Sequence, residues 1–550
     1  VVRLHYVEVD RPELASPSGD LGRLLAALER DWELTDLEVD LEVMRALQPA
    51  LERGDWKVTV AVHDGRDVTA VWPGLHEISY GVAIDVGSTT LAGHLANLAD
   101  GSVLASAGVM NPQIRFGEDL MSRVSYAMLH DNGAREMTRA VRAALSALIS
   151  GLAKQAAIPV TDILELAVVG NPIMHHLLLG IDPTPLGSAP FALATDRALR
   201  LRASELNLPA NAGARLYVLP CIAGHVGADT AGVLLAEEPQ RDSAAVRLVV
   251  DVGTNAEIVV GNRDRLLAAS SPTGPAFEGA QISAGQRAAP GAIERVRINR
   301  ETLEPRFRII GSELWSDEDG FAEATATSGI SGICGSGIVE AIAELFLAGV
   351  ITADGIVDGA LANRSARVVP DGRTFSYVLH DGAPRIAITQ NDVRAIQLAK
   401  AALYAGARLL MDHLGVEAVD EIRLAGAFGS QIDVVHAMVL GLIPDCDLDH
   451  VASAGNAAGT GALIALLSGA ARAEIETLVR RVEKIETAVE PRFQEHFVAA
   501  MAFPHRTASN PNLEAVVPLP RRQVTGAGPD RAEKRRRRLA AVASRGRRGT

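Results

Sequence analysis

The sequence contains little cysteine. Its three thiols, Cys221, Cys334 and Cys446, lie far apart in the chain, and no Cys-x-x-Cys pair occurs. This spacing excludes a local zinc site and the run of cysteines that binds a plant-type iron–sulfur cluster. Because few and scattered thiols are typical of a reducing compartment, we expect a cytoplasmic protein.

Aromatic residues and positive charge are also scarce. Aromatics make up 4% of the chain, and the formal net charge is −14. Few rings are therefore available for stacking on bases, and an acidic surface repels a phosphate backbone. The sequence shows no signal-peptide pattern and no apolar run of about 18 residues. We expect neither nucleic acid nor a membrane as a partner.

One motif occurs twice. Residues 84–90 read Ile-Asp-Val-Gly-Ser-Thr-Thr, and residues 250–255 read Val-Asp-Val-Gly-Thr-Asn. In each copy an apolar run typical of a buried strand leads into Asp, then Gly, then hydroxyl or amide side chains. Glycine permits close approach of the backbone to a ligand, and exposed N–H groups and hydroxyls suit a phosphate. Two copies predict two similar half-domains that face each other across a cleft.

The motifs supply the candidate site. We expect Asp85 and Asp251 to be catalytic and to position Mg²⁺, usually through water. Glu278 is a third candidate catalytic carboxylate, and a structural salt bridge is the alternative for it. Residues 332–337 precede an apolar helix, whose N-terminus offers donors to an anion, whereas Cys334 is expected to be an ordinary buried thiol. The residues predicted to bind phosphate or nucleotide here are Gly87, Ser88, Thr89, Thr90, Gly253, Thr254, Asn255, Gly335 and Ser336.

The rest of the chain divides around the two motifs. Residues 1–78 are predicted to form a small α+β domain, residues 79–240 the first half and residues 241–505 the second half. A helix is expected over about residues 472–489. Residues 506–550 are rich in proline and arginine and predict a disordered basic tail.

The order of three motifs resembles the acetate and sugar kinase, heat-shock 70 and actin superfamily. The first two are the repeated motif, and the third is Leu-Ala-Gly-Ala-Phe-Gly-Ser at residues 424–430. The resemblance implies an α/β fold of two ribonuclease-H-like halves with ATP between them. It also implies that residues 424–430 are the adenosine motif, with Gly426 and Gly429 close to adenosine, and that residues 455–462 begin the second connecting helix.

A narrower resemblance covers about residues 1–505. The segments 170–180, 220–230, 277–280, 334–337 and 392–401 resemble the reductive activators of corrinoid proteins. The resemblance implies a homodimer that uses ATP to return Co(II) cobalamin in a corrinoid protein to Co(I), with an electron from an N-terminal [2Fe–2S] domain. The four cysteines of that domain are absent, and residues 1–78 resemble the linker and middle region. We therefore expect the cluster only in a domain upstream of Val1, unless that domain has been lost.

Two other functions remain open on the same fold. A small-molecule kinase would use Glu278 or Asp229 as its catalytic carboxylate. A binding protein gated by ATP, similar to a chaperone, would need a peptide-binding β-domain after the ATPase core, and no such domain is evident.

Overall fold

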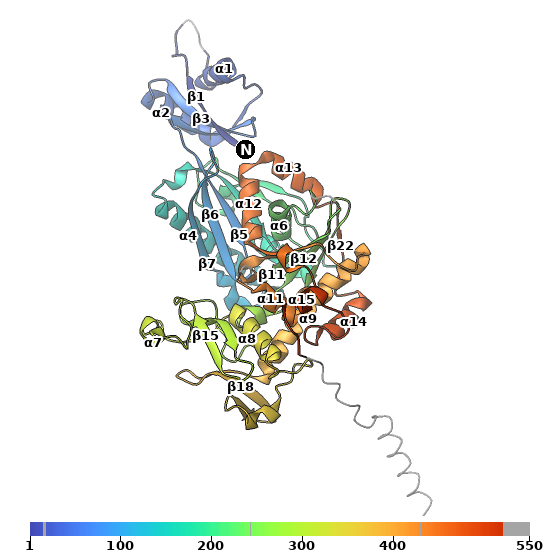
Figure 1. The fold of residues 1–550 in the computed structure, drawn as a ribbon. Coiled ribbons are helices and arrows are strands. Elements are labelled where there is room, and N and C mark those ends of the chain that lie inside the picture. The colour runs from blue at the N-terminus through green and yellow to red at the C-terminus, as the bar shows by residue number, and fades with distance from the viewer. Residues whose placement is uncertain (15–17, 242–243, 430, 521–550) are drawn as a thin grey trace, which may run out of the picture.

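The N-terminal domain is a small sheet with two helices on one face. The structure, a computed structural model, describes residues 1–14, 18–241, 244–429 and 431–520. The strands of this domain stand in the order β1-β3-β4-β2, and Leu24 and Leu28 of the first helix pack on Val58 and Val60. The elements are β1 (Val2–Glu8), α1 (Asp20–Trp32), β2 (Glu38–Val39), α2 (Leu41–Arg53), β3 (Lys57–His63) and β4 (Asp67–Pro73). The domain stands at one end of the molecule (Figure 1).

The first half is built on a six-stranded sheet in the order β7-β6-β5-β8-β10-β9. Strand β5 lies between β6, its antiparallel neighbour, and β8, its parallel neighbour. Its strands are β5 (Tyr80–Val86), β6 (Thr90–Asn97), β7 (Val103–Met110), β8 (Ile163–Gly170), β9 (Leu199–Arg202) and β10 (Arg215–Val218). Its helices are α3 (Leu120–Leu129), α4 (Gly133–Gln155), α5 (Pro172–Leu179) and α6 (Ala228–Glu237).

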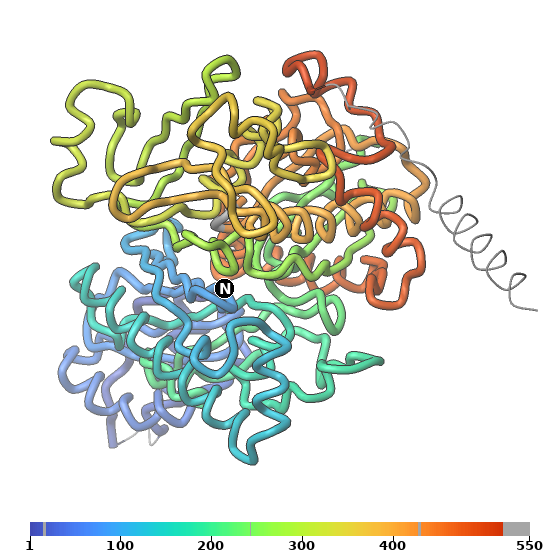
Figure 2. The backbone as a smooth tube through the Cα atoms, turned by 90° about the horizontal axis from the view of Figure 1, so that it is seen from below, coloured from blue at the N-terminus to red at the C-terminus, as the bar shows by residue number. Residues whose placement is uncertain are grey.

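The second half repeats this plan. Its sheet runs β21-β20-β11-β12-β13-β22, and β11 again lies between an antiparallel and a parallel neighbour. The strands are β11 (Arg247–Val252), β12 (Ala256–Gly261), β13 (Leu266–Ser271), β20 (Glu421–Ala425), β21 (Val451–Gly455) and β22 (Val482–Lys484). Because five strands follow the same order in both sheets, the prediction of two ribonuclease-H-like halves is confirmed. Figure 2 shows the two halves as separate lobes.

A long insertion between β13 and β20 enlarges the second half. It carries two three-stranded sheets, which lie at the end of the molecule away from the N-terminal domain (Figure 1), and two long helices. The elements are β14 (Ala292–Ile298), β15 (Pro305–Ile309), α7 (Phe321–Ala324), β16 (Gly332–Ile333), α8 (Gly335–Leu347), β17 (Val368–Asp371), β18 (Thr374–His380), β19 (Ile386–Ile388) and α9 (Gln390–Leu414).

Two helices lie between the two sheets. Helix α6 packs against α12 (Ala457–Leu467), and their apolar residues form one core with the facing sides of β5, β8, β11 and β12. The helices cross backbone to backbone, since a Cβ atom added to Gly461 would lie 1.9 Å from the carbonyl oxygen of Gly232. Small residues at the crossing therefore set how closely the halves approach.

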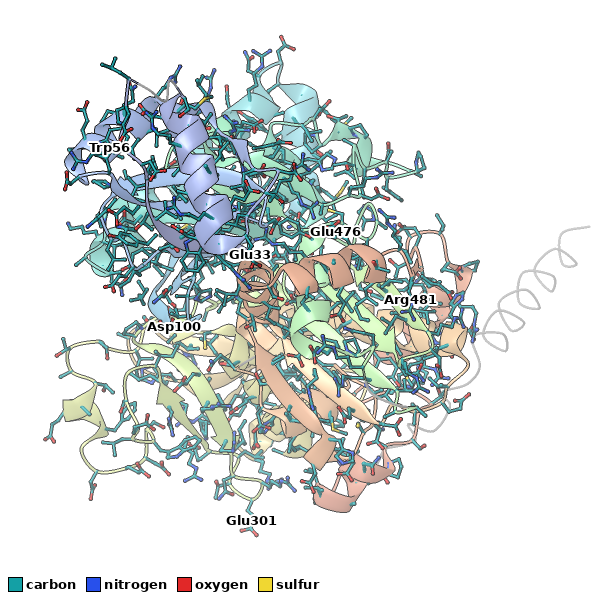
Figure 3. The ribbon with its side chains drawn as sticks, turned by 90° about the horizontal axis from the view of Figure 1, so that it is seen from above. Glu33, Trp56, Asp100, Glu301, Glu476 and Arg481 are labelled. Atoms are coloured by element: carbon teal, nitrogen blue, oxygen red, sulfur yellow. The ribbon has the colours of Figure 1, made fainter. Side chains whose placement is uncertain are left out.

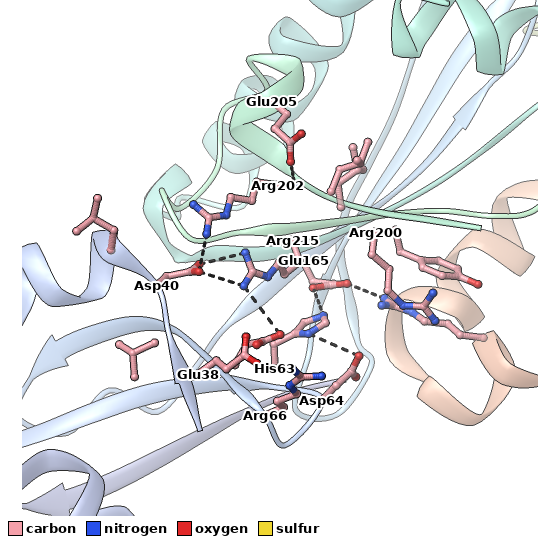
Figure 4. A pocket seen from close by; sticks show the side chains of 17 residues that line it. Glu38, Asp40, His63, Asp64, Arg66, Glu165, Arg200, Arg202, Glu205 and Arg215 are labelled. Carbon is pink, nitrogen blue, oxygen red and sulfur yellow. Dashed lines mark hydrogen bonds and ion pairs between the residues drawn. The ribbon is translucent and has the colours of Figure 1, made fainter. Parts of the chain in front are cut away.

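A buried polar junction joins the N-terminal domain to both halves (Figure 4). Glu165 of β8 is fully enclosed, and it accepts a hydrogen bond at 2.7 Å from Arg472, which lies on α13 (Gly469–Leu478). On its other side, Glu165 Oε2 lies 3.3 Å from His63 Nε2 of β3. Figure 3 shows the same region from above, with the N-terminal domain close to α13, which carries Glu476.

Two expectations about the C-terminal region differ from the structure. The helix expected over 472–489 ends at Leu478, and β22 then pairs in parallel with β13. Within the tail expected to be disordered, α15 (Pro511–Val516) is ordered. Its Leu513 is buried, and Asp445 accepts hydrogen bonds from the Asn512 and Leu513 N–H groups at 3.0 Å each. The basic run of the predicted tail lies outside the described residues.

Candidate functional site

Three aspartates meet where the two halves face each other. Asp85 is the last residue but one of β5, Asp251 holds the same position in β11, and Asp229 lies in the first turn of α6. Burial, followed by the charges of Asp251 and Asp229, raises the pKa of Asp85 to about 8. Burial and the charge of Asp229 likewise raise the pKa of Asp251 to about 7. The aspartates therefore repel one another and would be stabilised by a cation.

A fourth carboxylate extends this cluster. Glu257 of β12 is the cross-strand partner of Asp251, so both side chains lie on the same face of the sheet. Burial and the charges of Asp229 and Asp251 raise the pKa of Glu257. Carboxylate oxygens, directly or through water, are the ligands that Mg²⁺ prefers, so this set of donors fits the predicted magnesium site.

The first phosphate turn lies between β5 and β6. Gly87 makes the turn possible, since a Cβ atom there would lie 2.5 Å from the carbonyl oxygen of Thr90. Asn111 Nδ2 donates to the Gly87 carbonyl at 2.8 Å, and Arg123 Nη2 donates to the Ser88 carbonyl at 2.6 Å. The turn is thus fixed from behind, while Ser88 and Thr89 stay partly accessible and Thr90 is exposed.

Arg123 is a fully buried cation. Its Nε donates to the Gly117 carbonyl at 3.0 Å, and Nη1 lies 3.2 Å from Met174 Sδ. Within the described chain it makes no contact with a carboxylate, and burial lowers its pKa to about 10. Its positive charge therefore acts on the phosphate turn.

The second phosphate turn joins β11 to β12. Thr273 Oγ1 lies within hydrogen-bond distance of two carbonyls, that of Gly253 at 2.9 Å and that of Thr254 at 3.0 Å, and the Asn255 carbonyl accepts from the Gly253 N–H at 3.1 Å. Gly426 follows β20 with φ of +88°, and a Cβ atom there would lie 2.6 Å from Asp251 Oδ1. Only glycine allows the backbone to pass so close to this carboxylate.

Glu278 joins the two turns. It ends the short 3₁₀ helix Pro275–Glu278, and Thr254 Oγ1 donates to its Oε1 at 2.7 Å. Thr89 Oγ1, from the other half, donates to its Oε2 at 3.1 Å. Beside this bridge lies a cavity of about 230 Å³, whose lining includes Glu118, Gln286 and Arg287.

The structure does not bring every predicted residue to this cleft. Gly335 and Ser336 start α8, and neither lines the cavity. The Ser336 hydroxyl is buried and donates to the Glu294 carbonyl at 3.3 Å. Cys334 is buried, as expected, with Sγ donating to the Ile293 carbonyl at 3.3 Å. Gly429 packs on its own turn, where an added Cβ would lie 3.1 Å from the Leu424 carbonyl carbon. The roles predicted for these glycines and for Ser336 stay predictions.

Sequence reasoning missed the residues that support the turns. Arg123 belongs to a helix, where a charged residue is expected to face solvent, so the pattern gave no signal. Asn111 lies in a polar loop that the sequence marks only by its composition. Asn456 precedes α12 and bonds to Asp85 through its side chain. A search for polar residues just before a connecting helix would have found it.

The fold and the cleft define an α/β protein of the acetate and sugar kinase, heat-shock 70 and actin class. Three family models cover nearly all of the chain. Residues 1–78 match the RACo linker region, residues 80–242 the RACo middle region and residues 245–514 the C-terminal ASKHA domain of RACo. The chain belongs to the RACo family of reductive activators of corrinoid proteins. An ASKHA fold implies that the cleft binds a nucleotide.

Individual relatives agree with this assignment. The chain is 37% identical over 436 residues to the corrinoid activation enzyme RamQ of Eubacterium limosum, covering 77% of this chain and 70% of that protein. It is 25% identical over 387 residues to the Co(II) methylated amine-specific corrinoid protein reductase of Methanosarcina barkeri, covering 66% of each. A solved reductive activator for corrinoid, iron–sulfur protein superposes with a TM-score of 0.80 at 32% identity, covering 92% of this chain and 79% of that one. Among the described helices, none is long and apolar enough to cross a membrane.

Proposed function

We propose that this chain is the ATP-binding part of a system that returns an inactive corrinoid protein from Co(II) to Co(I). The observation that carries the proposal is the pairing of two phosphate turns across one cleft, each preceded by a partly buried aspartate. The names of the relatives supply the substrate, a corrinoid protein.

Different side chains of the cleft have different roles in binding MgATP. Asp85 and Asp251 hold Mg²⁺, which neutralises phosphate charge when bound. The hydroxyls of Thr89 and Thr254, with Ser88 and the turn N–H groups, bind the phosphates, and Gly426 and Gly429 pass close to adenosine. We infer that Asp229, the third aspartate of the cluster, orients water at the terminal phosphate, with Glu278 as the second candidate for a catalytic carboxylate.

The nucleotide influences the partner by changing the angle between the two halves of the molecule. ATP and ADP bind best at different angles between the halves, and a partner that prefers one angle is favoured by one nucleotide. Reduction of Co(II) to Co(I) consumes one electron. The residues of this chain do not fit a [2Fe–2S] cluster, because Cys221, Cys334 and Cys446 are buried, free and in separate places. A donor outside residues 1–550 supplies that electron.

Asp85→Ala tests the proposal. We expect the variant to keep its circular dichroism spectrum and to lose ATP-dependent formation of Co(I), followed by the absorbance of the corrinoid with an artificial electron donor. Asp100→Ala, which changes an exposed turn, is the control and keeps the activity. Full ATP-dependent activation by Asp85→Ala would overturn the assignment.

The state of the protein in solution is part of the proposal. Family resemblance supports a cytoplasmic homodimer without a nucleic acid or membrane partner. Light scattering on a size-exclusion column would measure the mass, and a monomer at all concentrations would contradict the homodimer.

A further inference from the structure

The hydroxyls assigned to phosphate binding already have an anionic partner. Glu278 accepts hydrogen bonds from Thr254 at 2.7 Å and from Thr89 at 3.1 Å, one from each half of the molecule. A carboxylate and a phosphate both present negatively charged oxygens to such donors. A threonine hydroxyl has one hydrogen to donate, so each can serve only one of the two acceptors.

A buried cation lies close to this point. Arg123 lies behind the first turn with no carboxylate in contact, and the charges of Asp119 and Glu278 oppose the lowering of its pKa by burial. Glu278 therefore places a negative charge near Arg123, and a nucleotide phosphate bound at the same turns would do the same.

A second place for the Glu278 side chain lies next to the first. The cavity of about 230 Å³ that Glu278 lines also has Arg287 in its wall. Arg287 is exposed and has no hydrogen-bond or ion-pair partner among the residues that the structure describes. An ion pair between Glu278 and Arg287 would thus use a cation that has no other partner in this part of the chain.

We propose that Glu278 is a built-in competitor of the nucleotide, which holds the two phosphate turns together in the empty protein and moves toward Arg287 when a nucleotide phosphate takes its place. This inference rests on the proposed function, because it needs a nucleotide in the cleft. It gives Glu278 two positions and makes the bridge between the halves depend on the nucleotide. When a nucleotide binds, Thr89 and Thr254 each give up the hydrogen bond to Glu278 and make one to a phosphate instead.

Binding of MgATP to four proteins tests the competition. Glu278→Gln removes the charge and should bind MgATP roughly tenfold more tightly in calorimetry, the equivalent of one charge-assisted hydrogen bond no longer displaced. Glu278→Ala should bind at least as tightly. Glu118→Gln is the matched control, because it removes a carboxylate from the same cavity that makes no hydrogen bond to either threonine, and its affinity should stay within twofold of the wild type.

Arg287→Met tests the second position. It should weaken MgATP binding severalfold in the wild-type background and have no effect in the Glu278→Gln background, where there is no charge to receive. Small-angle scattering of the empty Glu278→Gln protein should show a larger radius of gyration than the wild type, because the bridge between the halves is weaker.

The alternatives give other results. Weaker or unchanged MgATP binding by both Glu278 variants, with Asp251→Asn still abolishing binding, would overturn the competition and leave the proposed function standing. Unchanged affinity with a hundredfold loss of ATP hydrolysis would assign Glu278 to catalysis instead. If the folded wild type and all variants fail to bind MgATP, the proposed function fails, and the inference fails with it.

Discussion

Arg472 donates a hydrogen bond to Glu165 at 2.7 Å, and the two side chains are 3% and 0% exposed. The pair joins the second half to the first at the face that carries the N-terminal domain (Figure 4). A buried ion pair contributes little over apolar packing, but a single buried charge left without its partner is costly.

Loss of one partner of this pair should therefore destabilise the protein strongly. We expect Arg472→Met to lower the free energy of unfolding by about 3–5 kcal/mol in urea denaturation followed by circular dichroism. The double variant with Glu165→Gln should recover part of this loss, since no charge is left unpaired. Arg200→Ala breaks the more exposed pair of Arg200 with Glu476 and should cost no more than about 1 kcal/mol. A loss in Arg472→Met no larger than in this control would contradict the prediction.

Replacing one of the cleft aspartates should stabilise the empty protein. Burial and the charges of Asp251 and Asp229 disfavour the ionised form of Asp85, so Asp85→Asn removes a group that the empty cleft destabilises. In the wild type, Mg²⁺ with ATP at a hundredfold excess over Kd should add about 2.7 kcal/mol of stability. Melting curves should show a higher Tm for the empty variant and no further rise with MgATP. A rise equal to that of the wild type would show that Asp85 is not needed for binding.

His436 should make stability depend on pH between about 6.5 and 9. Its two ring nitrogens lie 2.8 Å from Asp433 and 3.0 Å from Glu344, and these contacts raise its pKa to about 9 against the effect of burial. Glu340 adds negative charge to this cluster, while Arg295 and Arg297 pair with Glu340. Because the folded protein holds this proton more tightly, the stabilisation is complete below pH 6.5 and is lost as pH rises through 9.

His436→Gln is the matched variant for this effect. The difference in unfolding free energy between wild type and variant should be largest at pH 6, on the order of 3 kcal/mol from 1.36 kcal/mol per unit of pKa, and should shrink toward pH 9. A difference that stays constant from pH 6 to 9 would mean that His436 stabilises by packing alone.

The crossing of α6 and α12 should not tolerate a methyl group. Gly461→Ala would force the helices apart and should cost about 1–3 kcal/mol, measured by thermal unfolding. Gly151→Ala is the control, because Gly151 is exposed on α4 with nothing within 4 Å of an added Cβ. Helix propensity predicts that the control gains about 0.5–1 kcal/mol. Equal effects of the two substitutions would contradict close contact at the crossing.

The sequence predicts the aspartates and the phosphate turns of this site well. It predicts poorly the side chains that hold the turns in place. Asp85, Asp251 and the turn residues follow strands whose apolar runs are distinctive, so local chemistry and local structure agree. Glu278 was identified as a cleft carboxylate, yet its bond to Thr89 joins residues that no local pattern relates. Arg123 was missed because its partners are backbone carbonyls, which leave no trace in side-chain composition.

Two predicted helix boundaries were wrong for a similar reason, because long-range contacts decide them. The polar run after Leu478 continues a helical pattern, but residues 482–484 pair in parallel with β13 and extend the sheet by one strand, a long-range contact that the local pattern does not show. Within the insertion, α8 begins at Gly335, three residues before the apolar helix that was expected to follow residues 332–337. Its glycines fit because Gly337 packs against the Ile293 carbonyl, where a Cβ atom would lie 2.2 Å away.

Helix α12 touches Asp85 through Asn456 at one end, crosses α6 at Gly461 in its middle, and leads into α13 at the other end. A rod that turns about its midpoint moves its two ends in opposite directions. A tilt of α12 about this crossing would therefore move Asn456 and the start of α13 in opposite directions. One pair of consecutive helices thus links the cleft to the contact of Arg472 with Glu165, which the N-terminal domain covers through His63.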